Sequence, residues 1–184
     1  MLPASFRRVD ISVKVLPMQT LEPPDSHHLS AAVGWIELGN MPEAKAELNR
    51  LSPGTRTHPD ALEAWWVIRA EEKDWSNGLA VANTLLEACP QSPTGWLHRA
   101  YALRRVEEGG LKAAWDALLP AFEKFPGEST IPYNLSCYAC QMGQLEEART
   151  WLQRAVKAGG IETIKRMALR DTDLKPLWDE INGI

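Results

Sequence analysis

Apolar side chains recur at the spacing of one helix face along most of this 184-residue chain. The spacing is clearest in two sets on either side of Gly143: Leu135, Ser136, Ala139 and Met142, then Leu145, Ala148, Leu152 and Ala155. Steps of three and four residues place such side chains on one side of a helix. Gly143 stands where a helix end favours a residue that tolerates positive φ. The pattern predicts two amphipathic helices joined by a tight turn.

This helix–turn–helix pattern returns with a period of about 34 residues, as in repeat proteins. Four units follow one another, over residues 26–57, 58–90, 91–126 and 127–160. Prolines mark their helix boundaries: Pro42, Pro59, Pro93 and Pro132 fall in first turns, and Pro90 and Pro126 fall just past helix ends. A first-turn proline is harmless because its missing N–H has no partner in the helix. The prolines therefore mark the register of the repeat.

The repeat resembles the tetratricopeptide repeat (TPR), in which aromatic and small residues hold fixed offsets and a proline closes the unit. The second and fourth units carry the resemblance best, through Trp65, Trp66, Leu85 and Pro90, and through Leu135, Ser136, Gly143, Ala148 and Ala155. The first unit lacks the closing proline, and the third has two extra residues near Gly109 and Gly110. The resemblance implies an all-α protein, a right-handed α-solenoid of four TPR units over residues 26–160.

Residues 161–184 are expected to form capping helices at the C-terminus of the array. A repeat array needs a terminal cap with a polar outer face, because its last unit otherwise leaves its apolar side in water. Leu174, Leu177 and Trp178 are the side chains expected to cover that side.

Residues 1–25 do not follow the repeat. Val9, Ile11, Val13 and Val15 alternate with polar residues, and a period of two favours a strand. Four interpretations stay open: the segment lies in the groove of its own array, adds to a partner's sheet edge, is a flexible tail, or precedes a true start at Met18.

Composition narrows the class of function. A net charge of −4 disfavours a nucleic-acid module, which needs clustered Lys and Arg. No stretch approaches the roughly 20 apolar residues of a membrane span. Three cysteines, an odd number, disfavour a disulfide framework. We therefore expect a cytoplasmic protein, whose membrane contact is at most peripheral and weak, through Arg7, Arg8 and Lys14.

Candidate chemistry is sparse. Cys137 and Cys140 form a C-x-x-C, but both fall in one predicted helix, without two further ligands for zinc and without the βαβ context of a redox pair. No nucleophile, metal-ligand or phosphate-loop signature stands out. We expect no enzyme, cofactor, metal site or small-molecule substrate, and keep a thiol oxidoreductase only as a disfavoured alternative.

A TPR array offers a surface for binding. Its first helices line a concave groove, and the residues at the groove-facing offsets are mainly apolar: Leu29, Val33, Ile36, Glu63, Val67, Ala70, Leu97, Tyr101, Arg104, Tyr133, Cys137 and Cys140. Exposed apolar strips mark binding sites, and Tyr and Arg often anchor interfaces. Trp115 and Trp151, on second helices, are expected to be only partly covered and rank second. The alternative is a groove filled permanently by the N-terminal segment or the C-terminal helices.

The short array and its ending are also similar to bacterial kinesin light chain, which accompanies bacterial tubulins. That resemblance implies an adaptor that binds along a tubulin-like filament and links it to a membrane. A generic TPR scaffold for an unrelated complex is the alternative. Chaperone-binding TPR proteins hold a peptide carboxylate with Lys, Asn and Arg, whereas the matching positions here are Leu29, Val33, Val67, Thr94 and His98. We expect no binding of chaperone tails by that mechanism.

Overall fold

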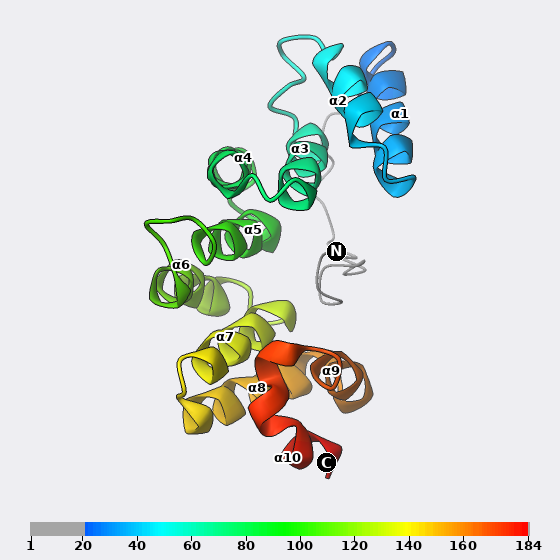
Figure 1. Ribbon diagram of the computed structural model, residues 1–184. Helices are drawn as coiled ribbons and strands as arrows, with labels where there is room; N and C mark the ends of the chain where they lie inside the picture. Colours follow the sequence, from blue (N-terminus) through cyan, green and yellow to red (C-terminus); the bar gives the residue numbers. More distant parts are fainter. Residues whose placement is uncertain (1–20, 184) are drawn as a thin grey trace. The chain divides into compact units, whose positions relative to one another are not determined.

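The computed structural model describes residues 21–183, and over these residues the regular structure is entirely helical. The α-helices, labelled in Figure 1, are α1 (Asp25–Glu37), α2 (Met41–Asn49), α3 (Pro59–Glu71), α4 (Trp75–Ala88), α5 (Pro93–Leu103), α6 (Leu111–Lys124), α7 (Thr130–Gln141), α8 (Leu145–Gly159), α9 (Ile161–Ala168) and α10 (Trp178–Asn182). The 3-10 helix η2 (Thr172–Leu177) lies between α9 and α10 in the chain. The strand predicted around Val9–Val15, and Met18, lie outside the described residues.

Three helix pairs end their first helix in the same way. In α1, α3 and α7 the chain turns at Gly39, Lys73 and Gly143, which have φ values of 75°, 58° and 78°. The N–H of Gly39 donates to the carbonyl of Ile36, and the next N–H, of Asn40, donates to the carbonyl of Trp35. The same two bonds recur after α3 and α7, and they define a Schellman turn, which satisfies the last helix carbonyls. The predicted tight turn is confirmed at Gly143.

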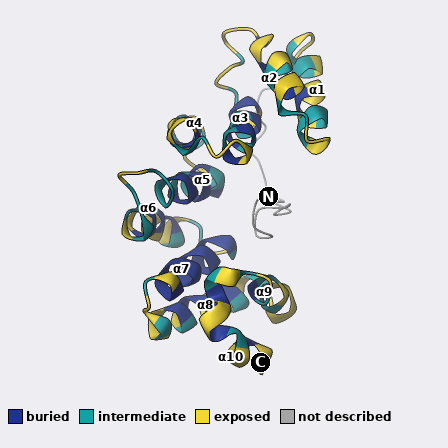
Figure 2. Ribbon diagram, in the orientation of Figure 1, coloured by how far each residue is buried: buried dark blue, intermediate teal, exposed yellow. Residues whose placement is uncertain are grey.

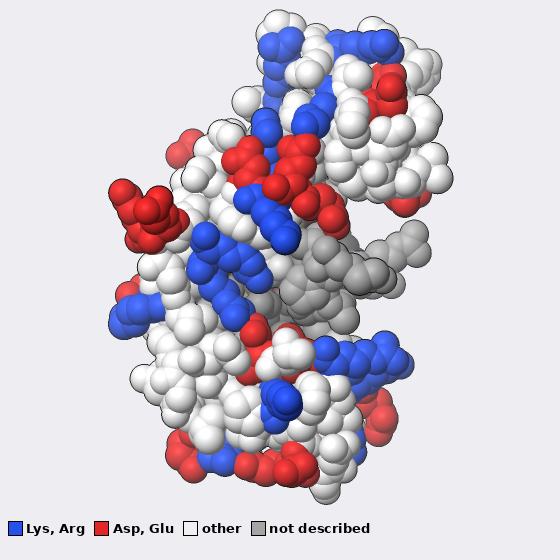
Figure 3. Space-filling view, in the orientation of Figure 1, with Lys and Arg blue, Asp and Glu red and all other residues white. Residues whose placement is uncertain are grey.

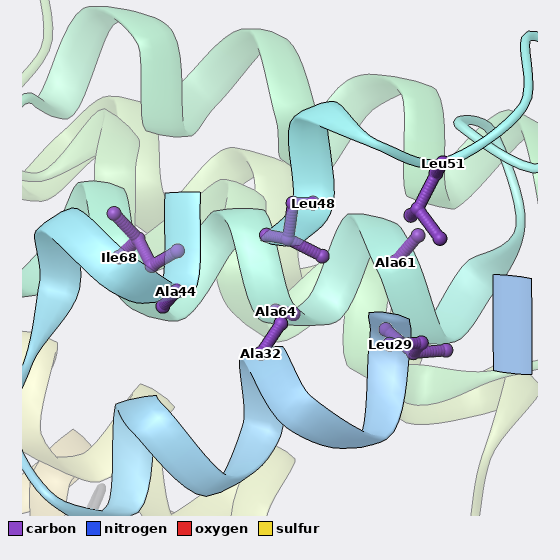
Figure 4. Close-up of a cluster of buried hydrophobic side chains, with 8 residues drawn as sticks. All are labelled: Leu29, Ala32, Ala44, Leu48, Leu51, Ala61, Ala64 and Ile68. Carbon is purple, nitrogen blue, oxygen red and sulfur yellow. The ribbon is translucent and has the colours of Figure 1, made fainter. Parts of the chain in front are cut away.

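Contacts divide the described chain into two compact units, residues 21–102 and residues 103–183. In the N-terminal unit α1 packs on α2 and α3, and α3 packs on α4. Figure 4 shows the core of the first three helices, which consists of Leu29, Ala32, Ala44, Leu48, Leu51, Ala61, Ala64 and Ile68. Ala32, Ala44 and Ala61 are fully buried. Their small side chains let the helix backbones approach closely.

Asp25 fastens the start of α1 to the loop that follows α2. Its carboxylate accepts hydrogen bonds from the Ser52 hydroxyl at 2.5 Å, the Thr55 hydroxyl at 2.6 Å and the Ser52 N–H at 2.9 Å. These bonds stabilise the charged form and lower the pKa of Asp25 from 3.8 to about 2.

In the C-terminal unit α7 is buried almost throughout, and Figure 2 shows it as a nearly continuous dark blue helix. The cause is that three elements cover it, α6, α8 and η2. The Ser136 hydroxyl donates to the carbonyl of Ala148 at 2.8 Å, which joins α7 to α8 at a fully buried position. The helices after α8 form the cap: α9 packs on α8, and Leu174 and Leu177 are buried while Trp178 is partly buried.

Replacing Lys73 with glycine should stabilise the protein. A non-glycine residue in the left-handed region destabilises the folded state by about 1–2 kcal/mol. Glycine avoids this strain, but it lowers the free energy of unfolding by about 0.4–1 kcal/mol because it gives the unfolded chain more conformational freedom. We expect Lys73→Gly to raise the free energy of unfolding by about 0.5–1 kcal/mol in urea denaturation. Gly143→Ala is the matched control and should lower it; an unchanged or lower stability of Lys73→Gly would contradict the role of strain.

The stability supplied by Asp25 should depend on pH. Because its folded pKa of about 2 lies below the ordinary value of 3.8, the contribution is fully present above the ordinary value and is lost as pH falls toward 2. In thermal unfolding we expect the melting temperature of wild type to exceed that of Asp25→Asn at pH 6. The gap between the two melting temperatures should shrink steadily from about pH 4 downward. A gap that stays constant down to pH 2.5 would rule out this linkage.

Candidate functional site

On the N-terminal unit the predicted groove residues of α1 and α3 remain partly open. Val33 is 43% exposed and the Glu63 side chain is 40% exposed, while Ile36 and Val67 are half-buried. We call these four residues the α1–α3 face. Leu29 and Ala70, which have the same predicted offsets, are buried, and Leu29 belongs to the core of Figure 4. The prediction that Leu29 lines an open groove is therefore wrong, because it packs among α1, α2 and α3.

Leu97 and Tyr101, on α5, are also buried, with 6% and 5% of their surface exposed. The Tyr101 ring meets Trp66 and Trp75 edge-on, with ring centroids 5.9 and 5.7 Å apart. Aromatic pairs at this separation contribute packing energy. Tyr101 was predicted as a partner anchor, and the structure instead places it in an aromatic cluster of its own unit.

His98 holds Glu63 in place. Its Nε2–H donates to the two carboxylate oxygens at 2.9 and 2.8 Å, and its ring stacks on Trp66 with centroids 3.6 Å apart and planes inclined by 6°. His98 was not among the predicted site residues. The signal was its separation of 35 residues from Glu63, close to one repeat period, which puts the two on consecutive first helices.

On the C-terminal unit three predicted groove residues converge on the segment Asp171–Asp173 of the cap. The Tyr133 hydroxyl donates to the Asp171 carboxylate at 3.1 Å, and Sγ of Cys137 lies 3.7 Å from the same oxygen. The Arg104 guanidinium donates to both carboxylate oxygens of Asp173, with Nη2 at 3.0 Å from Oδ1. We call these five residues the cap lock.

The cap lock corrects the prediction for Arg104, Tyr133 and Cys137. Tyr133 and Cys137 are 0% and 3% exposed, and the Arg104 side chain is 20% exposed, because the chain's own cap covers this face of α7. Within the C-terminal unit the alternative that C-terminal helices fill the groove is therefore the one observed. Cys140, on the same helix, is also buried, at 4% exposure.

Burial sets the protonation states in the cap lock. It raises the pKa of the Cys137 thiol well above its ordinary value, and the nearby Asp171 and Asp173 charges raise it further. Burial likewise raises the pKa of Tyr133, so that its hydroxyl stays a donor. For Arg104 burial acts to lower the pKa, but the hydrogen bond and the charge of Asp173 outweigh it and raise the pKa above its ordinary value. The lock therefore contains a neutral thiol and a fixed cation.

The donor atoms of Cys137, Asp171 and Asp173 lie within 4.8 Å of one another, close enough to hold a metal ion. The chemistry of the set does not fit one. The Arg104 guanidinium already neutralises Asp173 and the Tyr133 hydroxyl already donates to Asp171, so a metal ion would have to displace both partners. A raised thiol pKa at both Cys137 and Cys140 also opposes a reactive C-x-x-C pair, which needs a lowered one. We assign neither a metal site nor thiol chemistry to these residues.

Trp115 and Trp151 are more buried than predicted, at 8% and 5% exposure. Their rings meet at 83° with centroids 5.8 Å apart, and Phe122 meets Trp151 at 90° and 4.9 Å. Both Trp residues also line an open hollow of about 550 Å³ between α6 and α8. We call it the α6–α8 hollow; it is lined by Trp115, Leu119, Glu146, Glu147, Thr150, Trp151 and Arg154.

Charges of both signs are interspersed on the face drawn in Figure 3, without one large basic field. Among the helices described, none combines the length and the apolar character that a bilayer crossing requires.

Comparisons with known proteins establish the fold. No family model matches the chain, and no curated protein matches it. Among solved structures, a thermophilic TPR protein of Thermus thermophilus is similar over 87% of this chain and 100% of that chain, with a TM-score of 0.62 and 16% identity. The fold is a TPR solenoid. This finding confirms the predicted all-α solenoid of TPR units.

Two further structures have the same fold. MamA of Desulfovibrio magneticus RS-1 is similar over 89% of this chain and 94% of that chain, with a TM-score of 0.64 and 17% identity. Another MamA structure is similar over 86% of both chains, with a TM-score of 0.62 and 15% identity. At these identities the likeness concerns the TPR fold alone.

Breaking the cap lock should destabilise the C-terminal unit. Asp173→Ala leaves the largely buried Arg104 guanidinium without its carboxylate, so we expect a loss of about 1–3 kcal/mol in the free energy of unfolding. Asp116→Ala removes a solvated pair with Lys112 and should cost less than about 0.5 kcal/mol. Urea denaturation measures both, and equal losses in the two variants would show that the lock contributes no more than a surface ion pair.

Proposed function

We propose that the protein is a non-catalytic adaptor that binds a protein partner through the α1–α3 face. The observation that supports this most directly is the exposure of Val33, at 43%, on α1, which packs on α3, the helix whose Glu63 carboxylate is held in place by His98. Exposed apolar side chains together with an oriented charge are typical of a protein interface. All four residues lie on helices, whose backbone is fixed before a partner arrives.

Preorganisation favours Glu63 as the polar anchor of this face. His98 holds both carboxylate oxygens, and Trp66 stacks on His98, so that the position of Glu63 is determined from α5. A side chain that is already ordered loses less entropy on binding. A partner with a basic side chain opposite Glu63 and an apolar side chain opposite Val33 would complement the face.

We further propose a bacterial tubulin-like filament as the partner, on the basis of the similarity of this short array to bacterial kinesin light chain. The adaptor would then bind along the filament, and membrane contact would be peripheral. A generic TPR scaffold that uses the same face for an unrelated complex is the second candidate, and the TPR fold supports both equally. The C-x-x-C oxidoreductase is not retained, because the pKa of Cys137 and of Cys140 is raised.

Co-sedimentation with polymerised bacterial tubulin tests both parts of the proposal. Wild type should pellet with the filaments, and Val33→Asp should lower its affinity at least about tenfold, because a charge would be buried against an apolar contact. Leu38→Asp is the matched control: Leu38 is 77% exposed, immediately follows α1 and lies outside the α1–α3 face, so its replacement should have no effect.

The outcomes separate the candidates. Equal pelleting of wild type and Val33→Asp would show that the α1–α3 face is not the filament contact. A wild type that stays in the supernatant would exclude the tubulin partner. The scaffold alternative would then be tested by affinity capture with the same two variants, and capture that Val33→Asp leaves unchanged would reject the face altogether.

A further inference from the structure

The α6–α8 hollow has opposite charges at its two ends. Glu146 and Glu147 lie in the first turn of α8, and Arg154 lies two turns further along the same helix. A rise of 1.5 Å per residue places Glu147 and Arg154 about 10–11 Å apart along the helix axis. The apolar part of the lining consists of Leu119, which is 38% exposed, together with Trp115 and Trp151.

The charged ends are available to a ligand. Among the residues that the structure describes, neither Glu147 nor Arg154 takes part in an ion pair, and both are exposed. The Arg154 guanidinium lies over aromatic rings instead, 4.2 Å from the centroid of Trp151 and 5.3 Å from that of Phe122. These contacts hold Arg154 along one wall of the hollow, with a charge that has no counterpart on its own unit.

We propose that the α6–α8 hollow binds one amphipathic helix of a partner protein, which carries a basic residue, a large apolar residue and an acidic residue over two turns. The basic residue lies against Glu147, the apolar residue enters over Leu119 and the two Trp residues, and the acidic residue meets Arg154. Two helices that lie side by side have the same rise, so charges seven residues apart on α8 match charges seven residues apart on the partner.

The charges also select the ligand. A helix with two carboxylates at this spacing places one of them against Glu147 whichever way it lies, and like charges in contact weaken an interface strongly. A polyanion such as nucleic acid would meet Glu147, and a basic segment without an acidic residue would leave Arg154 uncompensated. A helix with one charge of each sign is the ligand that satisfies both ends and the apolar lining.

A displayed library of helical 18-residue peptides tests this proposal. Selection on wild type should enrich peptides with residues of opposite charge seven positions apart and a large apolar residue three or four positions from each. The best peptide and a doubly acidic twin, in which Glu replaces its basic residue, are then titrated, and we expect the twin to bind at least about tenfold more weakly.

The variant Glu147→Lys provides the decisive control, because it makes both ends of the hollow basic. Glu147 is exposed, so the fold is retained, which circular dichroism verifies. In this variant the preference should invert, and the doubly acidic twin should bind more tightly than the selected peptide. Leu119→Asp should weaken both peptides alike.

Several outcomes would overturn the proposal. One is enrichment of peptides without two opposite charges seven positions apart. Another is a preference that Glu147→Lys does not invert. The last is self-association of wild type that Leu119→Asp abolishes, because a second copy would then be the occupant. The proposal is independent of the α1–α3 face, since Val33→Asp should leave peptide binding at the hollow unchanged.

Discussion

A TPR helix pair cannot bury both of its apolar sides by itself, so each pair depends on a neighbour. In the N-terminal unit α3 supplies that neighbour to α1 and α2, and alanines at the crossings bring the three helices together. In the C-terminal unit α6, α8 and the cap cover α7 from three sides. This need for a neighbour decides which residues remain accessible to a partner. A first helix that is covered by an additional element no longer has an exposed face.

The helices and their turns were predictable because they depend on local spacing. The sets around Gly143 follow the helix period, and the left-handed turn there was anticipated from glycine alone. The equivalent turn at Lys73 was not, since nothing about lysine favours positive φ; the turn forms there because pairing of α3 with α4 and the Schellman hydrogen bonds outweigh the local cost.

The candidate site was predictable only in part. Offsets within a repeat identify which side of a first helix is free of its own pair, and this was sufficient for Val33 and Glu63. They do not reveal what else covers that side. Tyr133 and Cys137 are buried because Asp171 and Asp173, more than thirty residues away, return to the same helix. Cys137 and Asp171 are also one period apart, at 34 residues, but residues 161–184 do not carry the sequence pattern of the repeat, so this spacing did not predict the contact. The pairing of Glu63 with His98 was accessible in principle, since the two are about one period apart.

The cap has a consequence for assembly. TPR arrays can grow by adding helix pairs, and separate molecules can in principle stack end to end in the same way, because a bare terminal pair offers the surface that the next pair would use. Here α9 packs on α8, and η2 packs on α7 with its aspartates bound to Arg104 and Tyr133. These elements occupy the surface of α7 and α8 that a further helix pair, of the same or of another molecule, would use. The cap therefore covers the last repeat and leaves that surface closed to stacking.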